Sequence, residues 1–430
     1  MRQLRNRLPT WRLLRLSADI PPIPRADAPV VDVSRGPLPP PLRPDAGLAI
    51  LDITKHFAET TGGIRTYLLA KAAYVEARPE LRQVLVVPGA TGAIGQAAGA
   101  RCYQVPGRPI PTQSPYRFLL DAATIRGIIE HERPDLIEVG SPFAVPWVTR
   151  RANSRHRAPM VWFFHTDVPG IVAPRGAADG AARTLGGKAA WAYFRLLGRQ
   201  FHAVLAASET VAQALERNGV ERVARVTLGV DLDRFHPSRR AVASDTRRTW
   251  GLPEGPLGLF VGRLAREKQI DILFRAWPEI RRRTGATLVL AGNGPSAGHY
   301  RRMAPSDGVV WLPYQHDRDR LADLYAAADL YLAPGPAETF GLSALEAFAS
   351  GTPVLSVDRG GVAELLTASG AGLHYPSGDA GACAEAAIRL FQGDLPALGR
   401  RGRQHAETRH SWNTAFGRIF AVYREVLDRA

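Results

Sequence analysis

Residues 330–357 read LYLAPGPAETFGLSALEAFASGTPVLSV, and this run sets the fold class of the chain. Two short apolar runs, 330–333 and 354–357, predict buried strands, and the segment 341–349 between them predicts a helix. A strand, a helix and a second strand in this order are typical of a parallel sheet covered by helices. The run therefore predicts an α/β fold.

The helix and the loop before it carry two carboxylates, Glu338 and Glu346, with seven residues between them. Glu346 lies about two turns into the helix, because a turn takes about 3.6 residues. The first amides of a helix have no partner within it and lie at the positive end of its dipole, so they bind phosphate. We therefore expect Glu338 to accept sugar hydroxyls and Glu346 to hold a ribose. The amides between them would meet a diphosphate, and they belong to Thr339, Phe340, Gly341 and Leu342.

Two cations, Arg263 and Lys268, follow a predicted strand at 257–261. Gly262 and Arg263 come directly after the strand, and Lys268 lies five residues after Arg263. Arginine can hold phosphate oxygens through two hydrogen bonds, lysine supplies a compact charge, and glycine lets a ligand approach the backbone. Gly292 and Gly294 follow the next predicted strand, at 287–291, where they either admit a base or ribose or form a simple turn. Together these residues predict a nucleotide-sugar site.

Strands and helices alternate along the whole chain from residue 48 onward, which predicts two doubly wound domains that face a cleft. We place a basic, proline-rich and flexible leader at 1–44, a first domain at 45–236, a second at 237–411 and a closing helix at 412–430. The expected strands are 48–53, 83–87, 136–139, 161–164, 203–207, 223–228, 257–261, 287–291, 309–312, 330–333 and 354–357. The expected helices are 64–77, 118–131, 210–217, 270–283, 319–327, 341–349, 361–367, 380–391 and 412–427.

The first domain contributes two motifs at strand ends. Gly62 and Gly63, after Thr60-Thr61, open a helix, so their amides can reach a phosphate or the acceptor, although a plain strand-to-helix turn uses similar residues. His165 ends the strand 161–164 beside Asp167 and can bond a sugar or orient an acceptor. Because ligands of such folds bind at the carboxyl ends of the strands, we expect both motifs at the cleft.

One glycine motif argues for a different enzyme. Gly89, Gly92 and Gly95 resemble the NAD-binding fingerprint of an extended short-chain dehydrogenase. That fingerprint requires a helix of about three turns, and the apolar run beginning at Ala98 leaves no room for it. The dehydrogenase is therefore kept only as an alternative.

Two aspartate pairs, Asp231 with Asp233 and Asp317 with Asp319, resemble metal-binding pairs of some transferases. Neither pair is near the expected phosphate site in sequence, and aspartate is also common in turns and helix caps. We therefore expect no bound metal.

Charge and hydropathy limit the partners and the location. The chain has 430 residues and a formal net charge of +15, mostly from arginine, which favours an anionic membrane surface unless it reflects an arginine-rich composition alone. No nucleic-acid-binding motif is evident, and no apolar run reaches about 18 residues. We expect a cytoplasmic protein, with the inner face of a membrane as a candidate surface. Cys102 and Cys383 form no disulfide or metal spacing.

The order of these motifs resembles the family-4 retaining glycosyltransferases of the GT-B fold, over roughly residues 48–428. Supporting matches are Ser208-Glu-Thr, Gly229-Val-Asp231 and the helix that begins at Trp412. The stretch from Val161 to Pro169 is similar to members that transfer mannose or a related hexose to lipid-linked acceptors. Gln269 departs from the family, which usually has glycine after the lysine.

The resemblance implies two Rossmann-like domains, with a nucleotide-sugar donor on the second and a lipid or glycan acceptor on the first. It implies a metal-independent reaction without a cofactor, in which GDP-mannose or a UDP-hexose gives its sugar with retained configuration. His165, Arg263, Lys268 and Glu338 would be the catalytic residues. A nucleotide-sugar epimerase and a binding protein without activity remain as alternatives from other classes.

Overall fold

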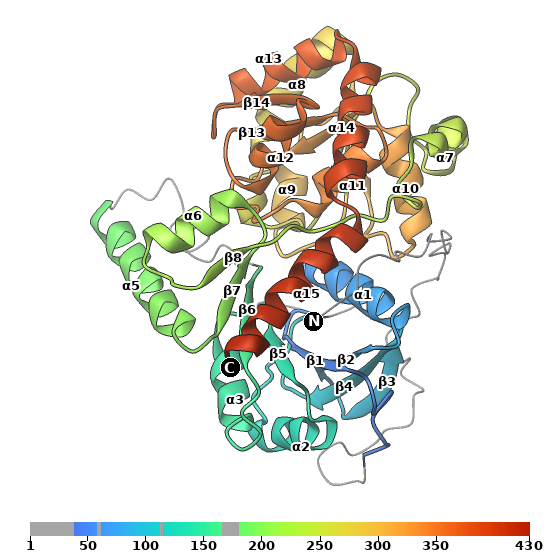
Figure 1. Cartoon of the computed structure of the whole chain (residues 1–430). Helices are drawn as coiled ribbons and strands as arrows, with labels where there is room; N and C mark the ends of the chain where they lie inside the picture. Colours follow the sequence, from blue (N-terminus) through green and yellow to red (C-terminus); the bar gives the residue numbers. More distant parts are fainter. Residues whose placement is uncertain (1–37, 58–61, 112, 114, 166–179) are drawn as a thin grey trace, which may run out of the picture.

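The computed structural model describes residues 38–57, 62–111, 113, 115–165 and 180–430. Most of the expected leader lies outside these residues, as do Thr60, Thr61 and Asp167. Figure 1 shows two α/β domains, one above the other, and each has a sheet with helices on its faces. In the part of the chain so described, no helix is long and apolar enough to cross a membrane.

The first domain contains an eight-stranded sheet in the order β3-β4-β2-β1-β5-β6-β7-β8. All neighbouring strands are parallel except β3 and β4, which are antiparallel. The central strands are buried on both faces, as parallel sheets between helices are. The strands are β1 (Leu48–Ile53), β2 (Leu81–Gly89), β3 (Ala93–Ala97), β4 (Ala100–Pro106), β5 (Leu136–Val139), β6 (Met160–Phe164), β7 (Ala203–Ala206) and β8 (Val223–Arg225).

The second domain contains a six-stranded, fully parallel sheet in the order β11-β10-β9-β12-β13-β14. Its strands are β9 (Leu257–Val261), β10 (Thr287–Ala291), β11 (Val309–Leu312), β12 (Leu330–Ala333), β13 (Val354–Val357) and β14 (Gly372–Tyr375). The first sheet therefore ends at residue 225 and the second begins at 257, and the boundary expected at 236–237 lies between them. This architecture confirms the predicted α/β class with two doubly wound domains.

Helices cover both sheets, and several begin at a residue whose side chain accepts a hydrogen bond from the first turn. The capping residues include Asp121, Ser208, Asp317, Asp379 and Ser411. The first-domain helices are α1 (Gly63–Glu76), α2 (Ala122–Glu132), α3 (Ala144–Ala152), α5 (Gly180–Gly198) and α6 (Glu209–Arg217). Those after residue 236 are η1 (Pro237–Val242), α7 (Ala243–Thr249), η2 (Arg266–Lys268), α8 (Asp271–Thr284), α9 (Ala297–Met303), α10 (Arg318–Ala327), α11 (Leu342–Ala349), α12 (Gly361–Ser369), α13 (Ala380–Phe391), α14 (Leu395–Arg409) and α15 (Trp412–Arg429).

The segment that resembled a dehydrogenase fingerprint forms a hairpin. Gly95 lies within β3, and β3 turns directly into β4 through Ala98, whose φ is 50°. No helix follows β2, so the segment has no helix N-terminus to hold a dinucleotide phosphate. The dehydrogenase alternative is therefore wrong.

The last helix returns to the first domain. Figure 1 shows α15 running from the upper domain down along α1. The chain crosses between domains twice at one place, where Val230 N donates to His410 O at 2.8 Å. On α15, the Tyr423 hydroxyl reaches the buried Lys71, which also contacts Asp52 at 2.7 Å. These contacts join both ends of the second domain to the first.

A buried histidine lies at this double crossover and predicts a pH effect on stability. Burial lowers the pKa of His410 from 6.5 to about 4, so the folded protein keeps the ring neutral while the unfolded chain protonates it below about pH 6.5. The stabilising contribution is therefore complete above pH 6.5 and falls as the pH drops toward 4. We expect the free energy of unfolding of His410→Asn to fall less between pH 7 and pH 5 than that of the wild type, by about 2 kcal/mol. Urea titrations at both pH values measure this difference, and equal losses would refute it.

Candidate functional site

A cleft of about 560 Å³ lies between the domains, at the carboxyl ends of both sheets. Its volume is within the range of small-molecule sites. The second domain supplies most of the residues expected to bind a donor, and the first domain supplies Gly62, Gly63 and His165. The predicted residues that line the cleft in the second domain are Gly262, Arg263, Lys268, Gly292, Glu338, Thr339, Phe340, Gly341, Leu342 and Glu346.

Lys268 and Glu338 form an ion pair within the cleft. Lys268 ends the short helix η2 after β9, and Glu338 lies in the loop before α11. Arg263 also lines the cleft, and its guanidinium lies 5.5 Å from the centre of the Tyr116 ring of the first domain. Among the described residues, four cations and three carboxylates line the cleft, which leaves a small local excess of positive charge for an anion; they are Arg65, Arg263, Lys268 and Arg318 against Glu267, Glu338 and Glu346.

The N-terminus of α11 opens on the same cleft. This helix begins after Gly341 and has no side-chain cap, unlike α6, α10 and α13. Gly341 has a φ of 98°, and a Cβ atom at this position would lie 2.3 Å from Cγ2 of Val362. Glycine is therefore required here both by conformation and by space. The turn it makes leaves the first amides of the helix available to an anion.

We expect Gly341→Ala to displace this loop. The substitution combines a strained backbone with a clash, so it should cost about 1–3 kcal/mol of stability and weaken diphosphate binding. Gly251→Ala is a matched control, because Gly251 also has a positive φ of 61° but has no atom within 4 Å of the added Cβ. Thermal unfolding and calorimetric titration with GDP or UDP, whichever binds the wild type, compare the two variants. Equal nucleotide affinity in both would contradict this role of the Gly341 turn.

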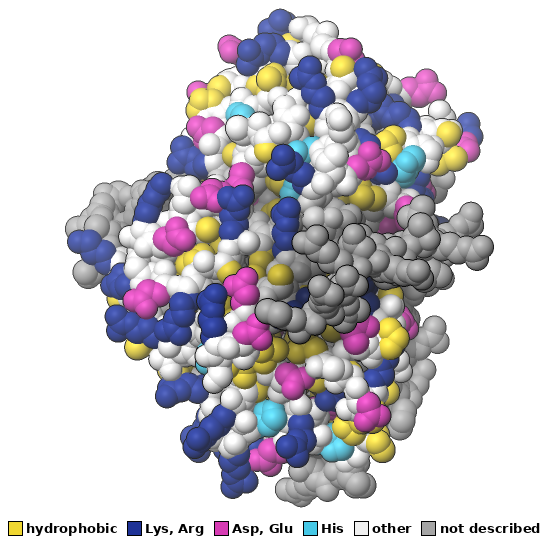
Figure 2. Space-filling model, viewed as in Figure 1, with side chains coloured by type: hydrophobic (Ala, Val, Ile, Leu, Met, Phe, Trp, Pro, Cys, Tyr) yellow, Lys and Arg dark blue, Asp and Glu magenta, His cyan; other side chains and the backbone are white. Residues whose placement is uncertain are grey.

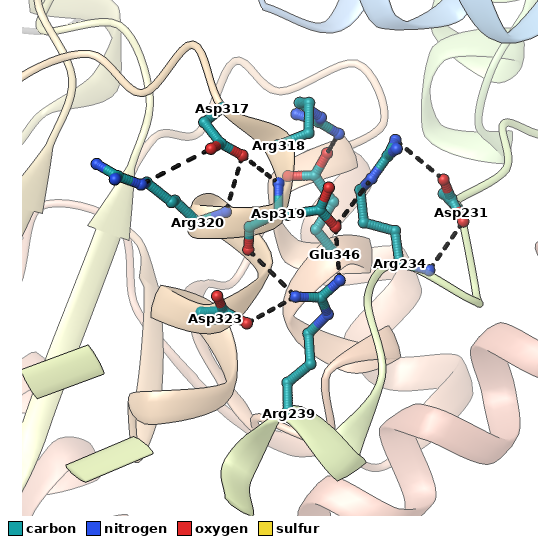
Figure 3. A network of polar contacts seen from close by, with 9 residues as sticks. All are labelled: Asp231, Arg234, Arg239, Asp317, Arg318, Asp319, Arg320, Asp323 and Glu346. Carbon is teal, nitrogen blue, oxygen red and sulfur yellow. Dashed lines mark hydrogen bonds and ion pairs between the residues drawn. The ribbon is translucent and has the colours of Figure 1, made fainter. Parts of the chain in front are cut away.

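The second glutamate is held by an arginine that the sequence did not reveal. Glu346 is 5% exposed, and its Oε1 accepts a hydrogen bond of 2.6 Å from Arg318 at the start of α10 (Figure 3). The Arg318 guanidinium also lies 5.0 Å from the centre of the Phe235 ring. A buried carboxylate fixed in this way keeps one orientation toward the cleft, which suits a group that holds a ribose.

Three of the aspartates in the two pairs that resemble metal ligands make contacts in the same network. Asp317 caps α10, accepting hydrogen bonds from the amides of residues 319 and 320, and Asp319 pairs with Arg239 at 2.5 Å (Figure 3). Asp231 pairs with Arg234 at 3.2 Å. Arg234 and Arg239 belong to the segment between the domains. Arg234 Nε also lies 3.5 Å from Asp319, so the two ion pairs of Asp319 tie that segment to the helix that orients Glu346. Capping and ion pairing therefore account for Asp231, Asp317 and Asp319.

The glycines after β10 have mainly a packing role. A Cβ atom at Gly292 would lie 2.0 Å from the carbonyl oxygen of Gly262, and one at Gly294 would lie 2.4 Å from that of Leu264. The two loops are joined by a 3.0 Å hydrogen bond from Leu264 N to Asn293 O. Gly292 lines the cleft, whereas Gly294 is not among its lining residues. Gly294 therefore packs against the loop after β9 and does not line the cleft, whereas the sequence predicted that it contacts the donor.

The first domain faces the donor side with a helix N-terminus and a histidine. α1 begins after Gly62 without a side-chain cap, and a Cβ atom at Gly63 would lie 3.2 Å from Leu342 across the cleft. The His165 ring stacks on Phe163 at 4.0 Å. Burial lowers the pKa of His165 to about 3, with the charge of His56 as a smaller cause. A neutral imidazole can give or accept a hydrogen bond at neutral pH, but it is not a store of positive charge.

The arrangement defines a two-domain enzyme that handles a nucleotide sugar. Paired cations and an uncapped helix N-terminus suit a diphosphate, and one carboxylate on either side of them suits sugar and ribose hydroxyls. Comparisons with known proteins agree. Residues 61–234 match the family described as Glycosyltransferase Family 4, and residues 255–393 match Glycosyl transferases group 1.

Curated relatives extend this match over most of the chain. A GDP-mannose-dependent alpha-mannosyltransferase of Mycobacterium tuberculosis is 32% identical over 281 residues, which cover 65% of this chain and 70% of the relative. A GDP-mannose-dependent alpha-(1-6)-phosphatidylinositol dimannoside mannosyltransferase of the same species is 30% identical over 344 residues, covering 79% and 84%. The chain therefore belongs to the family-4, group 1 glycosyltransferases, and it is an enzyme that moves a sugar from a nucleotide sugar.

Solved structures agree on the fold. Sucrose-phosphate synthase from Thermosynechococcus elongatus superposes with a TM-score of 0.70 at 21% identity, covering 89% of this chain and 100% of that one. Anabaena HepE, solved in complex with UDP and glucose, superposes with a TM-score of 0.69 at 19% identity, covering 87% and 99%. Both likenesses establish that the two domains form a GT-B fold.

Proposed function

We propose that the protein transfers mannose from GDP-mannose, with retained configuration and without a metal ion, to a lipid-linked acceptor. The observation that carries the proposal is the cleft in which Arg263, Lys268 and the uncapped N-terminus of α11 come together beside Glu338. The mannose donor is favoured because the two Mycobacterium tuberculosis relatives described above are named as GDP-mannose-dependent. A UDP-hexose is the alternative donor, and HepE was solved with UDP and glucose.

In the proposed reaction, the oxygen of an acceptor hydroxyl forms a bond to C1 of the sugar on the face from which the diphosphate departs. The bond between C1 and the phosphate oxygen breaks, and the hydroxyl proton passes to the departing diphosphate. Arg263, Lys268 and the helix amides stabilise the charge that develops on the leaving group, so these groups take the part that a metal ion plays elsewhere. Glu338 binds sugar hydroxyls, and the neutral His165 orients the sugar or the acceptor.

The test is transfer of radiolabelled mannose from GDP-mannose into a lipid extract, with and without EDTA. We expect labelled lipid in both samples and an α-configured product by NMR. Loss of transfer with EDTA would refute the metal-independent mechanism, and a β-configured product would refute retention. Donor turnover that needs no acceptor, with a changed sugar as the product, would instead support an epimerase.

Peripheral contact with an anionic membrane is part of the proposal. On the viewed face, Figure 2 shows Lys and Arg side chains spread over both domains among acidic ones, so net charge alone selects no surface. A local feature supports the first domain as the part that contacts the membrane. Phe143 is 46% exposed and lies at the start of α3, and the Lys55 ammonium is 5.5 Å from the centre of its ring. An aromatic ring beside a cation suits a lipid headgroup region.

We expect Phe143→Ser to lower co-sedimentation with phosphatidylglycerol vesicles and to leave GDP binding unchanged. Unchanged co-sedimentation would refute this surface.

A further inference from the structure

Ser208 joins the first domain to the loop that carries Glu338. It lies at the start of α6, is 3% exposed and donates from Oγ to the carbonyl oxygen of Thr339 at 2.8 Å. Thr339 in turn donates from Oγ1 to the carbonyl oxygen of His165 at 3.1 Å. The residue next to Glu338 is therefore hydrogen-bonded to the ends of two first-domain strand segments, one after β6 and one after β7.

Glu364 makes a second contact of the same kind from α12. Its carboxylate accepts hydrogen bonds from the amides of Glu209 and Thr210, both at 3.0 Å, and from the Thr210 hydroxyl at 3.2 Å. A carboxylate of the second domain thus occupies the N-terminus of α6 in the first domain, and α6 and α12 pack together at the junction (Figure 1). Both the charge and the helix dipole strengthen these bonds.

These contacts affect the geometry of transfer because the residues assigned to the reaction come from both domains. The donor residues Arg263, Lys268 and Glu338 lie in the second domain, and His165 lies in the first. Ser208 and Glu364 do not line the cleft, so they can act only through Thr339 and through the placement of α6. A displacement of about 1 Å between reacting groups is enough to slow a reaction by about a hundredfold.

We infer that Ser208 and Glu364 are positioning residues that hold the Glu338 loop in register with His165 across the cleft. Nucleotide binding does not need this register, since Arg263, Lys268, Glu346 and the amides at the start of α11 all belong to the second domain. Transfer does need it, because the sugar and the acceptor must meet between the domains. The inference rests on the proposed function only in its activity test, because kcat is measured for the proposed sugar transfer.

Glu364→Gln carries the test, since Ser208 also caps α6 by accepting a hydrogen bond from Val211 N and its loss weakens the helix itself. Glutamine is of equal size, but its amino group faces one of the two amides, so one hydrogen bond becomes a repulsion. Glu385→Gln is the matched control, an exposed glutamate of α13 in the same domain. We expect Glu364→Gln to lower kcat by roughly tenfold and to change GDP affinity by less than about twofold. Ser208→Ala should also lower kcat.

Hydrogen exchange gives a readout that does not depend on the donor or acceptor. The amides of residues 337–341 should exchange several-fold faster in Glu364→Gln than in the wild type and in Glu385→Gln. An unchanged exchange rate and unchanged kcat in folded Glu364→Gln would overturn the inference. Equal losses of GDP affinity and of kcat would also overturn it, because they would indicate a merely structural role. If the wild type transfers no sugar, the proposed function fails, and the exchange rates still decide the positioning role.

Discussion

Lys268→Met is expected to lose nucleoside diphosphate affinity by roughly 10- to 100-fold, because a hydrogen bond between charged groups contributes about 1.5–3 kcal/mol. Lys268 is paired with Glu338 in the cleft, and a bound diphosphate would compete for its ammonium group. Methionine keeps most of the aliphatic length and removes the charge. Calorimetric titration with GDP and UDP measures the effect.

Arg266→Met is the matched control for this substitution. Arg266 belongs to the same short helix η2, is exposed and is not among the residues that line the cleft. Its variant should bind nucleotide like the wild type, which separates a specific contact from a general loss of positive charge. Unchanged affinity in Lys268→Met, or an equal loss in both variants, would remove Lys268 from the diphosphate site.

Glu338→Gln is expected to lower the rate of transfer by roughly a hundredfold while nucleoside diphosphate still binds. The reason is that Glu338 is assigned to the sugar hydroxyls. Removing its negative charge next to Lys268 does not weaken the binding of an anionic diphosphate. Glu254→Gln, an exposed glutamate in the loop before β9, serves as the control. The measurements are initial rates of transfer and the dissociation constant of GDP. A loss of GDP binding would move Glu338 out of the sugar subsite.

The fold could be predicted largely from hydrophobic patterning. The parallel strands at 257–261, 287–291, 309–312, 330–333 and 354–357 have the bounds that the sequence predicted. The hairpin of β3 and β4 was missed because β3 contains Gly95 and both strands lie where a helix usually follows. β14 was missed for a similar reason: it begins at Gly372, a residue that is rare in strands, and a Cβ atom there would lie 1.8 Å from the carbonyl oxygen of Val354.

The site could be predicted where its residues follow strands or open a helix, as Arg263, Lys268 and Glu338 do. The partners that orient these residues could not. Arg318 meets Glu346 only because α10 and α11 start at the same edge of the sheet, and no local pattern encodes that meeting. The contact of Glu364 with α6 likewise depends on how the two domains face each other. Such nonlocal pairs require the tertiary structure.

The most direct test of the nucleotide-sugar site is thermal unfolding of the wild type and Lys268→Met with GDP, UDP and NAD, each added separately. A ligand at about 100 times its dissociation constant stabilises the folded protein by about 2.7 kcal/mol. We predict that GDP stabilises the wild type more than UDP does, that Lys268→Met loses most of this stabilisation, and that NAD has no effect. Stabilisation of the wild type by neither GDP nor UDP, or full stabilisation of Lys268→Met, would contradict the site described above.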